Sequence, residues 1–460
     1  MPPRRIVLAA SLLAILFGPG DHASASFSTG FSGPEVVSSD TGERDRAIDE
    51  ARAAGAKIVR LNAGWSGIAS SVPSDATDPG DPAYHFGRLD AAVESASKKG
   101  LEPLVTVGSA PAFAEGKDRP GSAAPGTWKP SGTAFGEFGQ ALAARYSGSF
   151  QGLPRVRFFQ AWNEPNLSNY LTPQYVGKRE VAAEIYRKLL NGFYEGVKSV
   201  NESNVVVTGG TAPYGDAPGG QRTRPLTFLR DLLCVSGEGR SKAKGCRSKA
   251  RFDVLAHHPI NTSGGPTKSA IHPDDASTPD FKYVRSVLRE AERRHTIATP
   301  GKHPLWATEI WWESNPPDRK RGLPLATQAR YLEQALYLLW KQGASVVINL
   351  DVRDPPTVND VNSIDAGVYF ADGRQKPSFT AWRFPFVTER ASGKKLRAWG
   401  MSPVGGNLSI QVKHGETWRT AKKLKVGAGK VFSTTLRLPG RQMLRAVVGG
   451  ERSLAWQQQR

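Results

Sequence analysis

The sequence is poor in cysteine, in long apolar runs and in acidic residues. Only two of its 460 residues are cysteines, which excludes a metal site built from a cysteine cluster. Its longest apolar run, residues 6–17, is 12 residues long, whereas roughly 20 are needed to cross a bilayer as a helix. We therefore expect no membrane span, and the 39% of hydrophobic residues indicates a globular chain rather than a disordered one.

The shortage of acidic residues leaves a large positive charge. There are 42 Asp and Glu against 61 Lys and Arg, a net charge of +19. Such a balance indicates an anionic partner, and nucleic acid and an anionic cell-envelope polymer are the two candidates.

The first residues favour the second candidate. Arg4 and Arg5 precede the apolar run 6–17, and residues 23–25 read Ala-Ser-Ala, the small-residue pattern of a cleavage site. We interpret residues 1–25 as a secretory signal peptide, with a buried N-terminal helix as the alternative. The protein is then expected to be secreted, outside a bacterial cell, where DNA and RNA are not its partners.

Secretion also bears on the two cysteines. Cys234 and Cys246 flank a polar stretch, residues 236–245, and an oxidising compartment favours a disulfide between them. A pair of free thiols is the alternative. Neither cysteine is given a catalytic role.

From residue 26 to residue 387, short apolar runs alternate with longer amphipathic segments. This alternation is typical of repeated strand–helix units, and eight of them predict a (β/α)8 barrel, the TIM barrel. A doubly wound open sheet is the alternative, but no glycine-rich phosphate loop follows the early strands. The strands are expected at residues 27–31, 57–61, 103–107, 156–162, 204–208, 252–256, 304–309 and 345–350, and the helices at 43–54, 89–99, 134–146, 181–200, 282–294 and 326–342.

The segments that follow several strands are long and rich in Pro, Gly, Asp and Ser. They cover residues 66–86, 110–133, 212–225 and 261–280. Loops of this length in a compact domain are usually functional, and in a barrel the loops after the strands surround the active site.

Beyond an aromatic helix at residues 379–386 the pattern changes. Residues 388–460 alternate in short runs such as 407–412 and 431–438, which predicts a small antiparallel β-sandwich domain. This domain holds 15 Lys and Arg against 3 Asp and Glu, a net charge of +12. We therefore expect any anionic cell-envelope polymer to bind here, although a merely solvated basic surface would have the same composition.

Two glutamates stand at the ends of predicted strands. The fourth strand runs into Asn163-Glu164-Pro165, and the seventh ends at Glu309. Strand ends at the barrel mouth are the usual place of catalytic residues, and strands four and seven face each other across it. Cleavage of a glycosidic bond requires a pair of carboxyl groups. A structural turn at Asn163 and a rim salt bridge at Glu309 are the alternatives for each site taken alone.

These motifs carry a resemblance to a known group of enzymes. The chain resembles a clan A retaining glycoside hydrolase of the family 5 and family 39 type, over essentially the whole barrel. The resemblance implies Glu164 as acid/base, Glu309 as nucleophile and Asn163 as partner of the sugar 2-hydroxyl. Arg60, in Val59-Arg60-Leu61, then lies beneath the nucleophile, and His258 lies in the site.

The resemblance has departures and leaves the sugar open. Ile260 stands where the family commonly has tyrosine, and Asn349-Leu350-Asp351 replaces an aromatic platform after strand eight. Glu313, past the strand end, is a second but weaker nucleophile candidate. For each single aromatic ring near a strand end, core packing is the more frequent role. The rings that could stack on sugar faces are those of Trp65, Phe113, Trp162, Tyr170, Trp311 and Trp312, of which Trp65, Trp162 and Trp311 are expected to bind substrate.

No motif points to a cofactor or a metal. His257 and His258 are adjacent, so they point to opposite sides of a strand and cannot bind one ion. The sequence has neither an H-E-x-x-H motif nor a G-x-S-x-G elbow after a strand. The prediction is a monomeric, secreted, retaining β-glycosidase acting on a carbohydrate substrate. The alternative is a non-catalytic or transglycosylating barrel that the basic domain anchors to the cell envelope.

Overall fold

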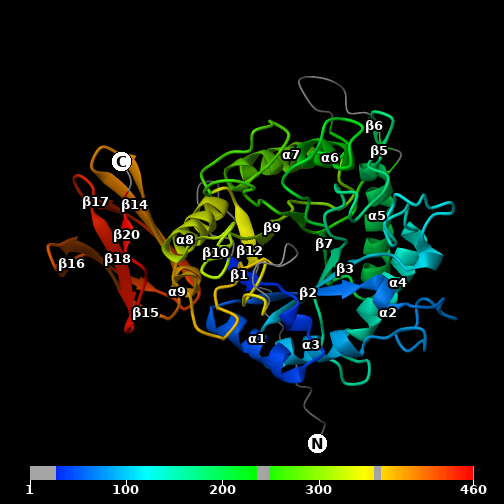
Figure 1. Cartoon of the computed structure of the whole chain (residues 1–460), viewed down its shortest axis with the longest axis horizontal. Coiled ribbons are helices and arrows are strands. Elements are labelled where there is room, and N and C mark those ends of the chain that lie inside the picture. The colour runs from blue at the N-terminus through cyan, green and yellow to red at the C-terminus, as the bar shows by residue number, and fades with distance from the viewer. Residues whose placement is uncertain (1–26, 236–245, 247, 357–363, 459–460) are drawn as a thin grey trace, which may run out of the picture.

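The architecture is a barrel followed by a smaller β domain, seen in a computed structural model that describes residues 27–235, 246, 248–356 and 364–458 (Figure 1). The signal peptide predicted at residues 1–25 lies outside the described residues. Of the chain that is described, no helix has the length and hydropathy to cross a membrane.

Eight parallel strands form the barrel. Each overlaps one of the eight predicted strands, and bridges from Val207 to Val254 and from Thr211 to His257 join the two ends of the sheet. The predicted TIM barrel is thus confirmed, and the open sheet is wrong. In sheet order the strands are β7 (Val205–Thr208), β4 (Phe158–Ala161), β3 (Glu102–Gly108), β2 (Ile58–Gly64), β1 (Ser28–Phe31), β12 (Ala344–Asn349), β9 (Leu305–Ile310) and β8 (Leu255–His257).

Helices surround the barrel, as the predicted amphipathic segments require (Figure 1). The side chain of Asp40 caps the first of them, and Ser131 caps α4 in the same way. The short helix α6, which begins at Pro225, was not among the predicted helices. The helices are α1 (Thr41–Ala53), α2 (Trp65–Ile68), α3 (Gly87–Lys98), α4 (Gly132–Arg145), α5 (Ala182–Val200), α6 (Pro225–Leu232), α7 (Phe281–Arg293), α8 (Leu325–Lys341) and α9 (Pro377–Arg383).

The loops at the barrel mouth carry small elements of their own. They include 3-10 turns η1 (Glu35–Val37), η2 (Ala112–Ala114) and η3 (Thr278–Asp280), and two-stranded pairs of β5 (Tyr175–Val176) with β6 (Arg179–Glu180) and of β10 (Ser314–Asn315) with β11 (Leu323–Pro324). Away from the mouth, in the connection between α6 (Pro225–Leu232) and β8, Cys234 and Cys246 form the expected disulfide.

Two antiparallel sheets make up the C-terminal domain. Alternate residues point into the space between the sheets, among them Leu396, Ile410 and Leu444, which are fully buried. One sheet contains β13 (Phe386–Ser392), β14 (Lys395–Ser402) and β17 (Lys430–Arg437); the other contains β16 (Thr417–Val426), β15 (Gly406–His414), β18 (Met443–Val448), β19 (Glu451–Arg452) and β20 (Trp456–Gln457).

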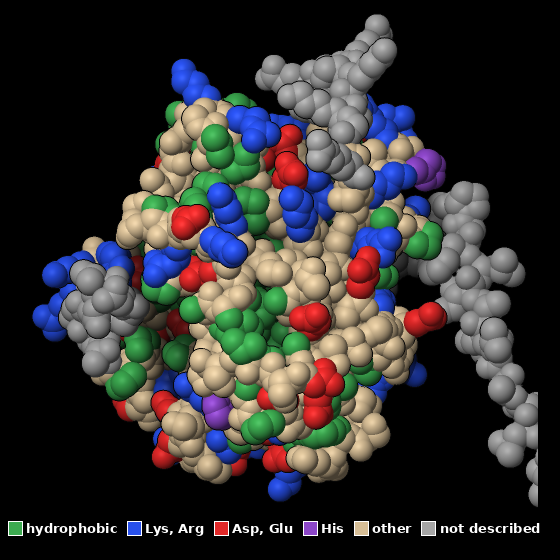
Figure 2. Space-filling view, turned by 90° about the vertical axis from the view of Figure 1, so that its right-hand side faces the viewer, with side chains coloured by type: hydrophobic (Ala, Val, Ile, Leu, Met, Phe, Trp, Pro, Cys, Tyr) green, Lys and Arg blue, Asp and Glu red, His purple; other side chains and the backbone are tan. Residues whose placement is uncertain are grey.

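Aromatic packing fixes this domain to the barrel beside α8 and α9 (Figure 1). Trp399 of β14 contacts Tyr337 and Trp340 of α8, with ring centroids 5.4 and 5.6 Å apart. An ion pair between Arg383 and Glu451, 2.8 Å long, lies at the same interface. The sandwich therefore packs against the barrel on the side opposite the face drawn in Figure 2. On the face that Figure 2 draws, cationic and acidic side chains are interspersed.

Candidate active site

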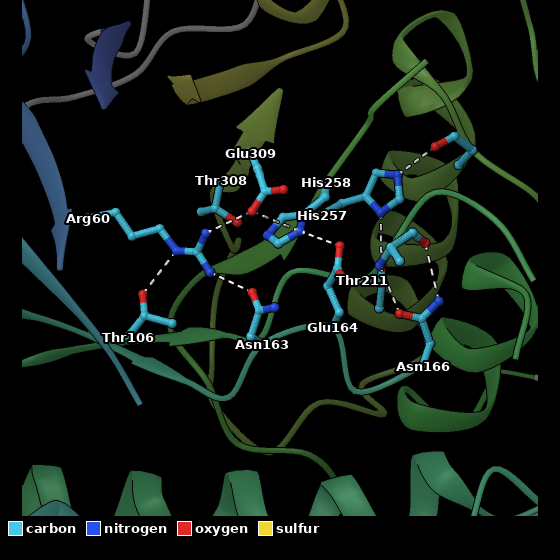
Figure 3. Close-up of polar contacts among 12 residues, drawn as sticks. Arg60, Thr106, Asn163, Glu164, Asn166, Thr211, His257, His258, Thr308 and Glu309 are labelled. Atoms are coloured by element: carbon cyan, nitrogen blue, oxygen red, sulfur yellow. Dashed lines mark hydrogen bonds and ion pairs between the residues drawn. The ribbon is translucent and has the colours of Figure 1, made fainter. Parts of the chain in front are cut away.

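A buried arginine organises the barrel mouth. Arg60 lies on β2 with 2% of its surface exposed. Its Nε donates to Thr106 Oγ1 of β3 at 3.1 Å and to Gln160 Oε1 of β4 at 3.0 Å. Its terminal nitrogens donate to Asn163 Oδ1 at 2.6 Å and to Glu309 Oε2 at 3.1 Å (Figure 3). The resemblance implied Arg60 beneath Glu309, and the structure brings the two together.

Glu164 is held by an unusual turn at the end of β4. Trp162 and Glu164 both have left-handed backbone conformations, with φ of 77° and 39°. Each such conformation costs on the order of 1–3 kcal/mol and persists only where the surroundings impose it, most often at functional sites. The turn is fixed by the Trp162 amide, which donates to the Val107 carbonyl at 2.8 Å, and by the Glu164 amide, which donates to the Gly210 carbonyl at 3.0 Å.

Glu164 and Glu309 face one another across the mouth. One oxygen of each carboxyl and a ring nitrogen of His258 all lie within 4.8 Å of one another. Carboxyl groups about 5–5.5 Å apart are typical of retaining glycosidases, whereas inverting enzymes separate them by about 6.5–9.5 Å. The oxygen-to-oxygen distance is closer to the spacing of a retaining pair than to that of an inverting pair.

His258, at the end of β8, lies between the two glutamates. Its Nδ1 is hydrogen-bonded to Glu164 Oε1 at 2.9 Å and is 3.8 Å from Glu309 Oε2. Its neighbour His257 points away, with Nδ1 bonded to Thr211 at 2.8 Å and Nε2 to the Ala276 carbonyl at 2.8 Å (Figure 3). The predicted opposite orientation of the two rings is confirmed.

The surroundings shift the protonation equilibria of Glu164 and His258. Burial raises the pKa of Glu164 to about 7, and the positive charge of Arg60 offsets only part of that effect. Burial also lowers the pKa of His258 to about 4, so the ring is neutral at pH 7. Glu309 instead has the guanidinium of Arg60 as a direct partner at 3.1 Å.

Several residues of the site were not predicted from the sequence. Thr106 and Gln160 hold the guanidinium of Arg60, and they can be found only by knowing which strands are neighbours. Gly210 follows β7, where a Cβ would stand 2.2 Å from His258 Nε2. Tyr170, named only as a possible stacking ring, has a side-chain hydrogen bond with Asn163, and burial with the charges of Glu164 and Glu309 raises its pKa to about 12.

Two of the predicted substrate-binding tryptophans are core residues. Trp65 and Trp162 are each 1% exposed. The ring of Trp65 packs on Phe135 and Phe138 at 5.3 and 5.5 Å, and Trp162 Nε1 donates to the Tyr170 carbonyl at 2.9 Å. Both rings fill space behind the site, which corrects the prediction that they bind substrate. Trp311 is half-buried and retains accessible surface.

The structure argues against Glu313 as the nucleophile. It is 7% exposed and pairs with Arg321 at 2.8 Å. In the part of the chain that the structure describes, Glu164, His258 and Glu309 are the one group close enough to hold a metal ion. The guanidinium of Arg60, 3.1 Å from Glu309, would repel a cation there, so these three residues fit acid–base chemistry better than metal binding.

Comparisons with solved structures give the same fold. A family 39 glycoside hydrolase from the gut symbiont Bacteroides cellulosilyticus WH2 matches with a TM-score of 0.55 and 17% identity, over 90% of this chain and 81% of that one. A glucosidase from Croceicoccus marinus matches with a TM-score of 0.51 and 13% identity, over 92% and 94%. The GH5_18 protein of Streptomyces cattleya in complex with GlcNAc matches with 0.50 and 14%, over 81% and 83%.

Sequence comparisons add nothing to this, since neither a family model nor a curated protein matches the chain. The identities to the solved structures are low, so these matches establish architecture rather than activity. The chain has the fold of the clan A glycoside hydrolases.

Proposed function

We propose that this protein is a secreted, retaining glycoside hydrolase that cleaves β-glycosidic bonds of a polysaccharide or glycoconjugate. The observation that carries the proposal is the pair formed by Glu164 and Glu309, whose oxygens lie within 4.8 Å and whose environments differ in charge. The basic N-terminal residues, the apolar run and the small-residue cleavage pattern in residues 1–25 support export.

The two carboxyl groups take different roles in the reaction. The carboxylate of Glu309, held by Arg60, attacks the anomeric carbon, while protonated Glu164 donates its proton to the leaving oxygen as the glycosidic bond breaks. The product of this step is a glycosyl ester on Glu309. Glu164, now a carboxylate, takes a proton from water; the water oxygen attacks the anomeric carbon, and the carboxylate of Glu309 leaves.

The decisive experiment replaces the nucleophile. Glu309→Ala is expected to abolish hydrolysis of aryl β-glycosides, and azide is expected to restore turnover of an activated glycoside as a glycosyl azide. Glu313→Ala is the matched control, because its carboxylate is paired with Arg321 away from the pair, and it should retain activity. Full activity in Glu309→Ala would refute the assignment, and a wild-type protein that cleaves no glycan would favour a non-catalytic barrel.

The sandwich domain supports a second part of the proposal, the binding of an anionic cell-envelope polymer. The strand register places Lys423 beside Ser409, and Arg445 beside Gln411, on the face turned away from the sandwich core. None of the residues of β15, β16 and β18 is acidic. Burial and then the nearby charge of Arg452 lower the pKa of Arg445, so an anion bound there would relieve the repulsion.

Binding to polygalacturonate, compared with a neutral glucan, tests this part. The double variant Lys423→Glu, Lys425→Glu is expected to weaken binding to polygalacturonate about tenfold or more, and added salt should weaken wild-type binding as well. Lys394→Glu, Lys395→Glu makes the same change of charge on the other sheet and is the control. If both double variants lose the same binding affinity, the binding depends on net charge in general and not on this face.

A further inference from the structure

An acidic cavity adjoins the candidate nucleophile. Two neighbouring cavities of about 540 and 510 Å³ open at the ends of β1, β2 and β12, and Leu350 and Asp351 line both of them. Asn349 pairs with Ile310 in the barrel sheet, and the Leu350 amide donates to the Ile310 carbonyl at 3.1 Å. Asp351 therefore lies beside the strand end that carries Glu309.

Asp351 has the properties of a ligand-binding group. It is only 6% exposed, and its carboxylate has no hydrogen-bond or ion-pair partner among the residues that the structure describes. The negative charges of Glu35 and Glu309 add to the effect of burial and raise the pKa of Asp351. A buried carboxyl without a partner is costly, so a group that binds here and donates hydrogen bonds is strongly favoured.

The other carboxyl groups around these cavities do have partners. Glu35 accepts from the backbone amides of Val352 and Arg353 at 3.1 and 3.4 Å, and so fixes the loop that carries Asp351. Asp354 forms a fully buried ion pair with Lys376 at 2.6 Å. Asp351 is thus left as the acceptor that points into the cavities from this loop.

The cations near the cavities do not neutralise Asp351. Arg353 forms an ion pair with Glu50. Arg88 lines both cavities, but it is exposed and its Nε donates to the Val37 carbonyl, so it lies at the rim. Asp351 thus lies near the carboxyl groups of Glu35 and Glu309 and pairs with no cation among the residues that the structure describes, so a further anion beside it is disfavoured.

Resting on the proposed glycosidase function, we propose that this cavity holds the glycone, and that Asp351 selects a sugar with hydroxyl or ammonium donors and rejects a sugar that carries a carboxylate. The cavity lies at the ends of β12, β1 and β2. In the sheet these strands lead from β9, which carries Glu309, to Arg60 on β2, on the side of the barrel away from Glu164. A glycone bound there has its anomeric carbon next to Glu309 and its leaving group toward Glu164. A carboxylate on that sugar would meet Asp351 with no cation between them.

The test compares three matched substrates that differ in the charge of one sugar. Values of kcat/KM are measured for 4-nitrophenyl β-glucoside, β-glucosaminide and β-glucuronide, and for the corresponding galacto-configured set. The wild type is expected to cleave the glucuronide about a hundredfold more slowly than the better of the other two. The ratio between the neutral and ammonium sugars then tells whether hydroxyl or ammonium groups are the preferred donors.

Variants assign the discrimination to Asp351. Asp351→Asn is expected to reduce the discrimination against the glucuronide at least about tenfold. Glu43→Gln is the control, because Glu43 lines the larger cavity but is engaged by the Ser38 hydroxyl, and its ratio should equal that of the wild type. If Asp351→Asn does not fold, Asp351→Ser, which also removes the carboxyl group, takes its place, and an unchanged discrimination in that variant overturns the role of Asp351.

The outcomes separate this inference from the proposed function. If the wild type cleaves the glucuronide as fast as the neutral glycoside, the inference is overturned and the function stands. If no glycoside is cleaved, calorimetric binding of free glucose, glucosamine and glucuronate to wild type and Asp351→Asn takes over. Binding of glucose or glucosamine that is lost in the variant supports the cavity while refuting hydrolysis, and binding of glucuronate alone overturns it.

Discussion

Replacing Glu164 by glutamine separates a general acid from a residue that only shapes the site. Burial raises the pKa of Glu164 from 4.5 to about 7, a shift that corresponds to about 3 kcal/mol. About half of the molecules therefore have the proton in place at pH 7. Above that pH the rate for a substrate that needs the proton should fall about tenfold for each pH unit.

The leaving group then decides the size of the effect. Glu164→Gln is expected to lower kcat/KM for a phenyl glycoside by about 10² to 10⁴, the usual contribution of general acid catalysis. A dinitrophenyl glycoside leaves without a proton, so bond cleavage should slow less than about tenfold and lose its decline above pH 7. Because Glu164 also activates water, the assay must follow release of the first phenol under single-turnover conditions.

Equal losses for the two leaving groups would refute the assignment of the acid. Asn166→Ala provides a control at the same turn, since Asn166 binds the Ala212 amide at 2.8 Å and contacts no group of the pair. It is expected to lower stability while leaving the difference between the leaving groups intact.

Three further predictions concern the supports of the site and the barrel. Arg60→Lys keeps the charge but cannot bind Asn163 and Glu309 together, so kcat should fall about tenfold to a hundredfold in steady-state kinetics, while an unchanged kcat would contradict the positioning role. Gly210→Ala puts a Cβ 2.2 Å from His258 Nε2, so the ring must move; the pH of the alkaline decline should shift, and an unaltered pH profile would count against the contact. Glu333 is buried with a pKa raised to about 8, so the folded state binds its proton more tightly and stability declines between pH 4.5 and about 8. Glu333→Gln should be more stable than the wild type at pH 9 by up to about 5 kcal/mol in urea unfolding, and an equal gain at pH 4 would contradict this origin.

The strands and the two glutamates could be predicted because each leaves a local signal. An apolar run that ends in Asn163-Glu164-Pro165 fixes both the strand and its exit, and Glu309 closes a run of the same kind. The supports of Arg60 leave no such signal. Thr106 and Gln160 are isolated polar residues in apolar strands, and their role depends on which strands are neighbours and in what register.

The prediction that two of the tryptophans bind substrate was wrong for a related reason. Trp65 and Trp162 lie at strand ends, as a sugar-stacking ring should, but an aromatic ring near a strand end can turn toward the helices as easily as toward the mouth. Phe135 of α4 contacts both rings, and that packing decides the direction. The position of a residue along a strand thus predicts which end of the barrel its side chain occupies. It does not predict whether the side chain faces the barrel mouth or the surrounding helices.

The division of labour between the glutamates comes from one cation rather than from the carboxyl groups themselves. Both side chains are nearly buried, with 12% and 15% of their surfaces exposed, so burial does not distinguish them. Arg60 forms its ion pair with Glu309. Its charge lowers the pKa of Glu164 by less than burial raises it. The guanidinium is fixed by Thr106 and Gln160, so it cannot swing toward Glu164 to equalise the two. The strained turn at residues 162–164 then keeps Glu164 beside neutral His258, so the backbone leaves Glu309, and not Glu164, as the ion-pair partner of Arg60, and this asymmetry is what the proposed roles of acid and nucleophile require.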